Sequence, residues 1–214
     1  STQWSEKINV EYTKNSLLKN KKVVMHNWEH PIMKKHSEVI TRNGGDILEL
    51  GFGMGISADY IQKQNINSHT IIENNEVVFE KLKVWAEDKP NVKIIFGDWK
   101  SNLPDMKFDG ILKDTYDDKL GAVMFPHMIL DVCKNGTIVS FFNDYLKPKT
   151  IYQGVDGKFP LFLEDSFVNF YRVGIEPPDE IDYLSGDGDF YFVPEWIVSE
   201  NDTKENFSER INRK

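Results

Sequence analysis

The chain has 214 residues, of which 40% are hydrophobic and 28% are charged, and its formal net charge is −8. This composition is typical of a soluble globular domain with a sizeable core, and no apolar run is long enough to span a bilayer. The first residues also lack the basic and then apolar layout of a signal peptide. The negative charge argues against a protein that binds nucleic acid by neutralising phosphates, and the single cysteine, Cys133, excludes an internal disulfide.

From residue 46 onward, short apolar segments alternate with amphipathic segments. The apolar segments predict five strands, at residues 47–50, 69–72, 92–96, 108–112 and 137–142. Strands that alternate with helices in this rhythm indicate right-handed βαβ units. We therefore predict an α/β fold with a doubly wound, mostly parallel sheet and helices on both of its faces.

The helices between these strands are predicted from apolar spacing and from residues that start or stop a helix. Residues 57–64 can form a helix with Ser57 as its N-cap. A second helix has apolar residues at positions 78, 82 and 85 and closes before Pro90. A third helix starts near Leu120 and is predicted to stop at Asn135-Gly136.

Two further strands are predicted at residues 167–175 and 189–198. No helix separates them closely, so we expect an antiparallel pair at the edge of the sheet. The chain would then hold a seven-stranded sheet in a single domain.

A glycine-rich turn, Gly51-Phe52-Gly53-Met54-Gly55, follows the first of these strands. Glycines suit such a turn because the backbone bends sharply there and a ligand can approach it closely. Glu73 ends the second strand about twenty residues later, where a carboxylate can accept hydrogen bonds from two ribose hydroxyls. Asp98 and Trp99 follow the third strand, where a nucleobase could lie. A tight turn without a ligand is the alternative interpretation.

The spacing of the glycines distinguishes between nucleoside ligands. The dinucleotide fingerprint is G-x-G-x-x-G, with a pyrophosphate at the start of the helix. Here the spacing is G-x-G-x-G and Ile56 follows. S-adenosylmethionine carries no phosphate, so the spacing favours this methyl donor over NAD.

Residues 26–30 spell H-x-x-E-H, which is also the zinc-ligand signature of one class of metalloproteases. A zinc hydrolase that uses His26, Glu29 and His30 is therefore an alternative. Pro31 opposes it, because proline disfavours helix at the preceding residue and suits the first turn of a helix. We expect a helix from Pro31 onward and no metal.

Several segments together resemble guanidinoacetate N-methyltransferase and, to about the same degree, the fungal protein-arginine methyltransferase that modifies the δ-nitrogen. Both belong to the class I S-adenosylmethionine-dependent methyltransferases. The resemblance covers roughly residues 4–145, and the segments that carry it are VVMHNWEHPIM, DILELGFGMGIS, HTIIENNE, FGDWKSNLP, FDGILKDTYDD and VSFFN.

The resemblance implies the following site residues. Those implied for the cofactor are Trp4, Met33, Gly51, Phe52, Gly53, Met54, Gly55, Ile56, Ser57, Glu73, Asn74, Asp98, Trp99 and Asp114. Those implied for the substrate are Met25, Glu29, Asp114, Asn143, Asp144 and Tyr145, with Glu29 and Asp114 as the catalytic carboxylates that grip a guanidinium. Residues 1–40 would form a lid, residues 41–145 the cofactor-binding core, and residues 146–214 the edge strands and a substrate loop.

The chemistry of a guanidinium fits two carboxylates. The cation has a pKa above about 12 and is a poor nucleophile, and carboxylates can bind its planar fork. Asp114 would accept a proton while the nitrogen attacks the sulfonium methyl group. Asp144-Tyr145 and Lys113 depart from the family pattern, which leaves the rest of the substrate open.

We therefore expect a cytoplasmic S-adenosylmethionine-dependent N-methyltransferase that acts on a guanidino or amidino group of a small cationic molecule. We expect it to be a monomer or a weak homodimer without a nucleic-acid or membrane partner. Methylation of arginine in a protein is the first alternative. A nucleoside-binding module without catalysis is another.

Overall fold

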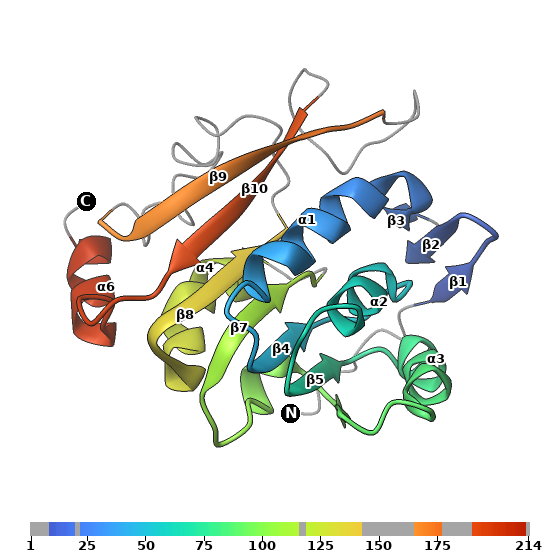
Figure 1. Cartoon of the computed structure of the whole chain (residues 1–214), viewed down its shortest axis with the longest axis horizontal. Coiled ribbons are helices and arrows are strands. Elements are labelled where there is room, and N and C mark those ends of the chain that lie inside the picture. Colours follow the sequence, from blue (N-terminus) through green and yellow to red (C-terminus); the bar gives the residue numbers. More distant parts are fainter. Residues whose placement is uncertain (1–8, 20–21, 116–118, 143–164, 177–189, 213–214) are drawn as a thin grey trace, which may run out of the picture.

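The computed structural model describes residues 9–19, 22–115, 119–142, 165–176 and 190–212. A seven-stranded sheet dominates this part of the chain, in the order β6-β5-β4-β7-β8-β10-β9 (Figure 1). Its strands are β4 (Asp46–Leu50), β5 (Ser68–Glu73), β6 (Val92–Phe96), β7 (Phe108–Lys113), β8 (Cys133–Phe141), β9 (Phe167–Gly174) and β10 (Phe190–Ile197). The first five strands in this order are parallel, and β10 is antiparallel to both of its neighbours. The predicted α/β sheet with an antiparallel edge is confirmed.

Helices cover both faces of the sheet because side chains alternate between the faces along each strand. They are α1 (His30–Ile40), α2 (Ile56–Gln62), α3 (Glu76–Ala86), α4 (Lys119–Ile129) and α6 (Lys204–Asn212), with short 3-10 helices η1 (Asn27–Glu29), η2 (Trp99–Ser101) and η3 (Leu130–Val132). Ile47 of β4 belongs to a buried cluster with Ile40 of α1 and Ile61 of α2. Its neighbour Leu48 belongs to the cluster of Phe125 on α4. Neighbouring residues of the strand therefore pack against opposite helix layers, α1 and α2 on one face of the sheet and α4 on the other.

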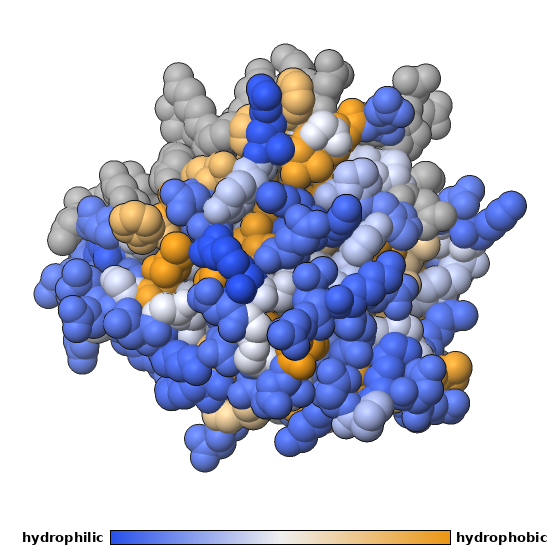
Figure 2. Space-filling view, viewed as in Figure 1, coloured by the Kyte–Doolittle hydropathy of each residue, from blue (hydrophilic) through white to orange (hydrophobic). Residues whose placement is uncertain are grey.

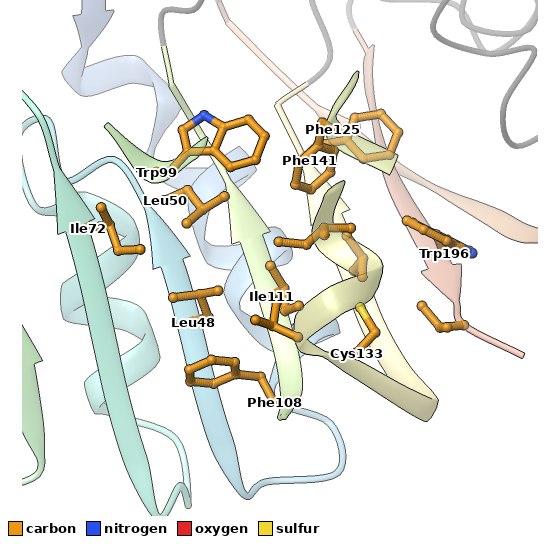
Figure 3. Packing of buried hydrophobic residues seen from close by; sticks show 14 of the residues in the cluster. Leu48, Leu50, Ile72, Trp99, Phe108, Ile111, Phe125, Cys133, Phe141 and Trp196 are labelled. Carbon is orange, nitrogen blue, oxygen red and sulfur yellow. The ribbon is translucent and has the colours of Figure 1, made fainter. Parts of the chain in front are cut away.

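The cluster on the α4 side extends along the length of the sheet. Trp99 lies at one end of it beside Leu50, and Phe108 lies at the opposite end (Figure 3). The ring of Phe125 meets the Trp99 indole edge-on at a centroid distance of 5.8 Å. The hydrophobic core therefore holds the indole in place at the end of the sheet where β4 and β5 finish.

Two local predictions were wrong. Gly55, with a φ of 77°, is the N-cap of α2, whereas Ser57 lies inside the helix and donates its hydroxyl hydrogen to Glu49. Asn135-Gly136 does not stop a helix, because α4 ends at Ile129 and these residues belong to β8. Gly136 has a φ of 93°, and the register between β7 and β8 shifts here. The pair therefore forms an irregularity in a strand, where glycine supplies the left-handed conformation.

The N-terminal residues form a separate antiparallel sheet of β1 (Val10–Tyr12), β2 (Ser16–Lys19) and β3 (Lys22–His26). It lies on the side of the molecule where α2 and α3 are found (Figure 1). The chain then passes through η1 into α1, with Pro31 in the first turn of α1 as predicted. Glu29 occupies the N-cap position. These elements connect the small sheet directly to the main domain.

On the face shown in Figure 2, hydrophilic residues predominate and hydrophobic residues form small, separated groups. None of the helices in the described part of the chain is long and apolar enough to cross a membrane.

A buried histidine connects α1 to the sheet. His36 is fully buried, and its Nδ1 lies 2.6 Å from the Ser140 hydroxyl on β8. Ser140 donates its own hydrogen to the carbonyl of Pro194, so the hydrogen between His36 and Ser140 must be on Nδ1. The Tyr191 hydroxyl lies 3.4 Å from Nε2. Burial lowers the pKa of His36 from 6.5 to about 3, so the ring is neutral in the folded protein.

This histidine should make folding sensitive to acid. In the unfolded chain His36 takes up a proton near pH 6.5, whereas in the folded chain it does so only near pH 3. The contribution of neutral, buried His36 to the free energy of unfolding is therefore complete above pH 6.5 and is lost as the pH falls toward 3. Below pH 6.5, the free energy of unfolding of the wild type should fall more steeply than that of His36→Asn, by up to about 1.4 kcal/mol per pH unit. Urea unfolding at several pH values measures both slopes. Parallel slopes for the two proteins would show that His36 is not the responsible group.

Candidate functional site

A cavity lies where four parallel strands end. Gly51 follows β4, Glu73 ends β5, Gly97 follows β6 and Asp114 follows β7, and all four residues line the cavity. The space amounts to about 760 Å³, with the open mouth included. Its lining consists of Val10, Leu17, Lys19, Gly51, Gly53, Ile72, Glu73, Asn74, Asn75, Val78, Gly97, Trp99, Asp114 and Thr115. The carboxyl edge of a parallel sheet is the usual ligand position in α/β folds.

The glycine turn brings the backbone of β4 and β7 together at this edge. Gly51 has a φ of 88°, and a Cβ atom at this position would lie 2.2 Å from the carbonyl oxygen of Asp114. Only glycine fits both constraints. The amide of Gly51 donates to the Ile72 carbonyl at 2.8 Å, and the amide of Asp114 donates to the Leu50 carbonyl at 2.9 Å. Gly51 and Gly53 therefore present bare backbone to the cavity.

Glu73 is held in one orientation by the backbone. Its side chain is almost fully buried, at 8% exposure. One carboxylate oxygen accepts the Phe52 amide hydrogen at 3.0 Å, and the other accepts the Asn75 amide hydrogen at 2.9 Å. Each oxygen keeps a further acceptor site, so the carboxylate can accept two more hydrogen bonds from the cavity. Two neighbouring hydroxyl groups, such as those of a ribose, match this arrangement.

Apolar residues and Trp99 form another part of the cavity lining. Gly97, Ile72, Val78 and Trp99 contribute to the lining there. Asp98 takes a different position: it accepts the Lys100 amide hydrogen at 2.9 Å as the N-cap of η2, and its carboxylate lies 3.2 Å from the Lys100 ammonium. The structure thus places Trp99 in the cavity wall and uses Asp98 to start the short helix that carries it.

Five residues expected at the methionine part of a cofactor do not line the cavity, namely Phe52, Met54, Gly55, Ile56 and Ser57. Met33, which was expected to close over the ligand, does not line it either. Met33 and Ile56 share a buried cluster with Leu17, against which Met54 packs. The ring of Phe52 packs on Trp85 at a centroid distance of 5.4 Å. These side chains support the glycine turn from behind, and only its backbone faces the ligand space.

A buried polar network behind the turn was missed from the sequence. Glu49 is fully buried, and it accepts hydrogen bonds from the Ser57 hydroxyl and from Nε2 of His69, the latter at 2.9 Å. The Gln62 amide lies 3.0 Å from Nδ1 of His69, and donation by this amide leaves the ring hydrogen on Nε2. The network joins β4, α2 and β5 and so fixes the helix that begins at the turn.

The two carboxylates predicted to be catalytic have different surroundings. Asp114 is partly buried and lines the cavity together with Thr115. Glu29 is only 1% exposed, lies at the N-cap of α1, and is not part of the cavity lining. Trp4, Asn143, Asp144 and Tyr145 lie outside the described residues, as does the side chain of Met25.

The zinc interpretation gains no support from the positions of its residues. His30 is exposed on the first turn of α1, and its Nδ1 lies 3.1 Å from the hydroxyl of Tyr60. Within the part of the chain that the structure describes, no three His, Cys, Asp or Glu residues come together as a metal site.

The N-terminal sheet lies within residues 1–40, for which a lid was expected, and it supplies a wall of the cavity through residues that were not predicted individually. Val10, Leu17 and Lys19 belong to the lining, and Lys19 is the single basic residue in it among the described residues. The residues share one face of β1 and β2, because Val10 is paired with Lys19 and Leu17 follows the same alternation. This period of two is present in the sequence, but two strands of three and four residues give only a weak signal.

Solved structures with a similar fold include spermidine synthase from Thermotoga maritima and the N-methyltransferase NodS from Bradyrhizobium japonicum. The first has a TM-score of 0.60 and 15% identity, with 92% of this chain and 72% of that chain covered. The second has a TM-score of 0.59 and 13% identity, with 81% of this chain and 97% of that chain covered. At these identities the likeness shows the fold alone, a Rossmann-like α/β sheet with helices on both faces.

Sequence relatives include protein arginine N-methyltransferase 2 from Kluyveromyces lactis and from Aspergillus oryzae. The first is 34% identical over 152 residues, which are 64% of this chain and 37% of the relative. The second is 38% identical over 130 residues, which are 56% of this chain and 31% of the relative. The chain spans about a third of the length of these curated relatives. Residues 1–137 match the family of guanidinoacetate N-methyltransferase. Because this match covers more than half of the 214 residues, the chain belongs to the guanidinoacetate N-methyltransferase family.

Proposed function

We propose that this protein is an S-adenosylmethionine-dependent N-methyltransferase that acts on a guanidino or amidino group of a small molecule. The observation that carries the proposal is one cavity lined by both Glu73 and Asp114. Glu73 offers two oriented oxygens for a ribose, and Asp114 offers a carboxylate to a cation in the same space. The family and the relatives are named after guanidinoacetate and arginine, which share a guanidino group.

The cavity suits S-adenosylmethionine in each of its parts. Glu73 would hold the ribose hydroxyls, and the apolar wall with Trp99 would hold the adenine. Gly51 and Gly53 leave room for the methionine part. The bound cofactor supplies an electrophilic methyl group on a sulfonium. The acidic residues of the wall offset the charge of two cations brought close together.

The acceptor needs a carboxylate partner because a guanidinium ion has no localised lone pair. Asp114 would orient the planar cation by accepting hydrogen bonds from its N–H groups. It would take one proton at a carboxylate oxygen as the new N–C bond forms and the bond between sulfur and the methyl group breaks, which releases neutral S-adenosylhomocysteine. Glu29 is assigned as the second carboxylate on the family resemblance alone, because it is buried at the N-cap of α1 and does not line this cavity.

Methylation of an arginine side chain in a protein is the second candidate. The relatives that match this chain at 31–38% identity are named protein arginine N-methyltransferase 2, and this name favours the second candidate. Both candidates need the same cofactor and the same carboxylates. They differ only in what lies beyond the guanidino group.

A labelling experiment tests the proposal and separates the candidates. The purified chain is incubated with methyl-labelled S-adenosylmethionine and either free guanidinoacetate, arginine and simple amidines, or a cell lysate. We expect label in at least one free guanidino or amidino compound. Label in macromolecules alone would support the protein-arginine reaction instead. If no acceptor is labelled although calorimetry detects bound S-adenosylhomocysteine, the protein is a nucleoside-binding module, and the proposal is wrong.

A further inference from the structure

One face of the N-terminal hairpin is turned toward the cofactor cavity. The register pairs Val10 with Lys19 and Tyr12 with Leu17, so these four side chains lie on the same face. Three of them line the cavity. The fourth, Tyr12, reaches the glycine turn instead.

Tyr12 connects three elements of the site. Its hydroxyl donates to the carbonyl oxygen of Gly53 at 2.7 Å, across 41 positions of the sequence. The Lys81 ammonium on α3 lies 4.6 Å from the centre of its ring. Burial, with a smaller contribution from the charge of Glu73, raises the pKa of Tyr12, so the hydroxyl keeps its hydrogen at physiological pH. The hydroxyl therefore stays protonated as a hydrogen-bond donor near Glu73, the carboxylate proposed to bind the ribose.

This hydrogen bond fixes a peptide group that would otherwise turn easily. Gly53 has a φ of 56° and no side chain to restrict its rotation. In a trans peptide the carbonyl oxygen and the next N–H point in opposite directions. When Tyr12 holds the Gly53 carbonyl, it also sets the direction of the Met54 N–H. The orientation of the turn and the position of the hairpin thus depend on one hydroxyl group.

We propose that Tyr12 is a positioning residue for the methyl donor: its hydroxyl holds the glycine turn and the β1–β2 hairpin together around the cavity and thereby sets cofactor affinity and residence time. Loss of the hydroxyl frees both the Gly53 peptide and the hairpin wall, so a bound cofactor dissociates faster. The inference rests on the methyl-donor part of the proposed function and is independent of the acceptor.

The test compares Tyr12→Phe with Tyr171→Phe. Tyr171 lies on β9, at the opposite edge of the sheet, and donates to Glu195 at 3.1 Å. Each variant loses one hydrogen-bonded hydroxyl and keeps the ring. Calorimetry gives the Kd of S-adenosylhomocysteine, stopped flow gives its dissociation rate, and thermal unfolding gives the stability of each free protein.

Tyr12→Phe should raise the Kd about 3- to 10-fold, mainly through faster dissociation, as expected for one lost hydrogen bond. It should raise the KM for S-adenosylmethionine in proportion and change kcat by less than about twofold. The two variants should lower the Tm of the free protein to a similar extent, but Tyr171→Phe should leave the Kd unchanged. A Kd for Tyr12→Phe within twofold of the wild type, or an equal loss in both variants, overturns the inference. If the wild type binds S-adenosylhomocysteine but methylates no guanidino compound, the proposed acceptor is wrong and the comparison of the two tyrosine variants still tests the role of Tyr12. If the wild type does not bind S-adenosylhomocysteine, both the proposed function and the inference about Tyr12 are wrong.

Discussion

Asp114→Asn should lower kcat for methyl transfer by about 10²- to 10⁴-fold, the usual contribution of a general base. The amide keeps the shape of the carboxylate but can neither neutralise a guanidinium nor take its proton at pH 7. The Kd of S-adenosylhomocysteine should change by less than about tenfold, because Glu73 and the glycine turn are unaltered. Single-turnover rates with a labelled methyl donor measure the chemical step, and calorimetry measures cofactor binding.

Asp109→Asn is the matched control on the same strand. Asp109 lies at the opposite end of β7, where it accepts the Asp46 amide hydrogen at 2.8 Å and pairs with Lys134 at 2.7 Å. Burial alone would raise the pKa of Asp109, but Lys134 and the amide outweigh it and lower the pKa. This variant should therefore lose stability and retain kcat per folded molecule. Retention of more than a tenth of the wild-type rate by Asp114→Asn would rule out Asp114 as the proton acceptor.

The parts of the site that could be predicted are those fixed by short stretches of sequence. Gly51 and Glu73 each follow or end a buried apolar run, and the carboxyl ends of parallel strands necessarily lie side by side. Asp114 was placed by the same reasoning together with the family resemblance. In these cases the position of a residue along a strand already determines its position in space.

Contacts between distant segments could not be predicted. Glu49 and His69 are twenty positions apart on adjacent strands, and the bond from Tyr12 to Gly53 spans 41 positions. The direction of a side chain is a second limit. Ser57 follows the glycine turn, but its hydroxyl points back to Glu49, because α2 has its N-cap at Gly55, two residues earlier than the N-cap preference of serine indicates.

Glu73→Gln should raise the Kd of S-adenosylhomocysteine by about 100-fold. Hydrogen bonds to a charged group contribute about 1.5–3 kcal/mol each, and in this variant two ribose hydroxyls would face a neutral amide in place of a charged carboxylate. The amide also cannot satisfy both backbone donors. In either orientation its NH₂ group faces the amide of Phe52 or of Asn75, so one N–H loses its acceptor. The free energy of unfolding should therefore fall by about 1–3 kcal/mol as well.

The specific effect on the ribose can be separated from this general loss. Glu80→Gln makes the same chemical change on α3, where the side chain is 70% exposed and pairs with Lys83 at the surface, so it should alter neither the Kd nor the stability by much. The 2′-deoxy analogue of S-adenosylhomocysteine supplies the second comparison. The wild type should bind the analogue at least about tenfold more weakly than the parent compound, whereas Glu73→Gln should bind the two almost equally, because the hydroxyl has already lost its charged acceptor. An undiminished preference for the parent compound in Glu73→Gln would mean that the ribose is held by another residue, and that the two backbone donors orient Glu73 for a structural purpose alone.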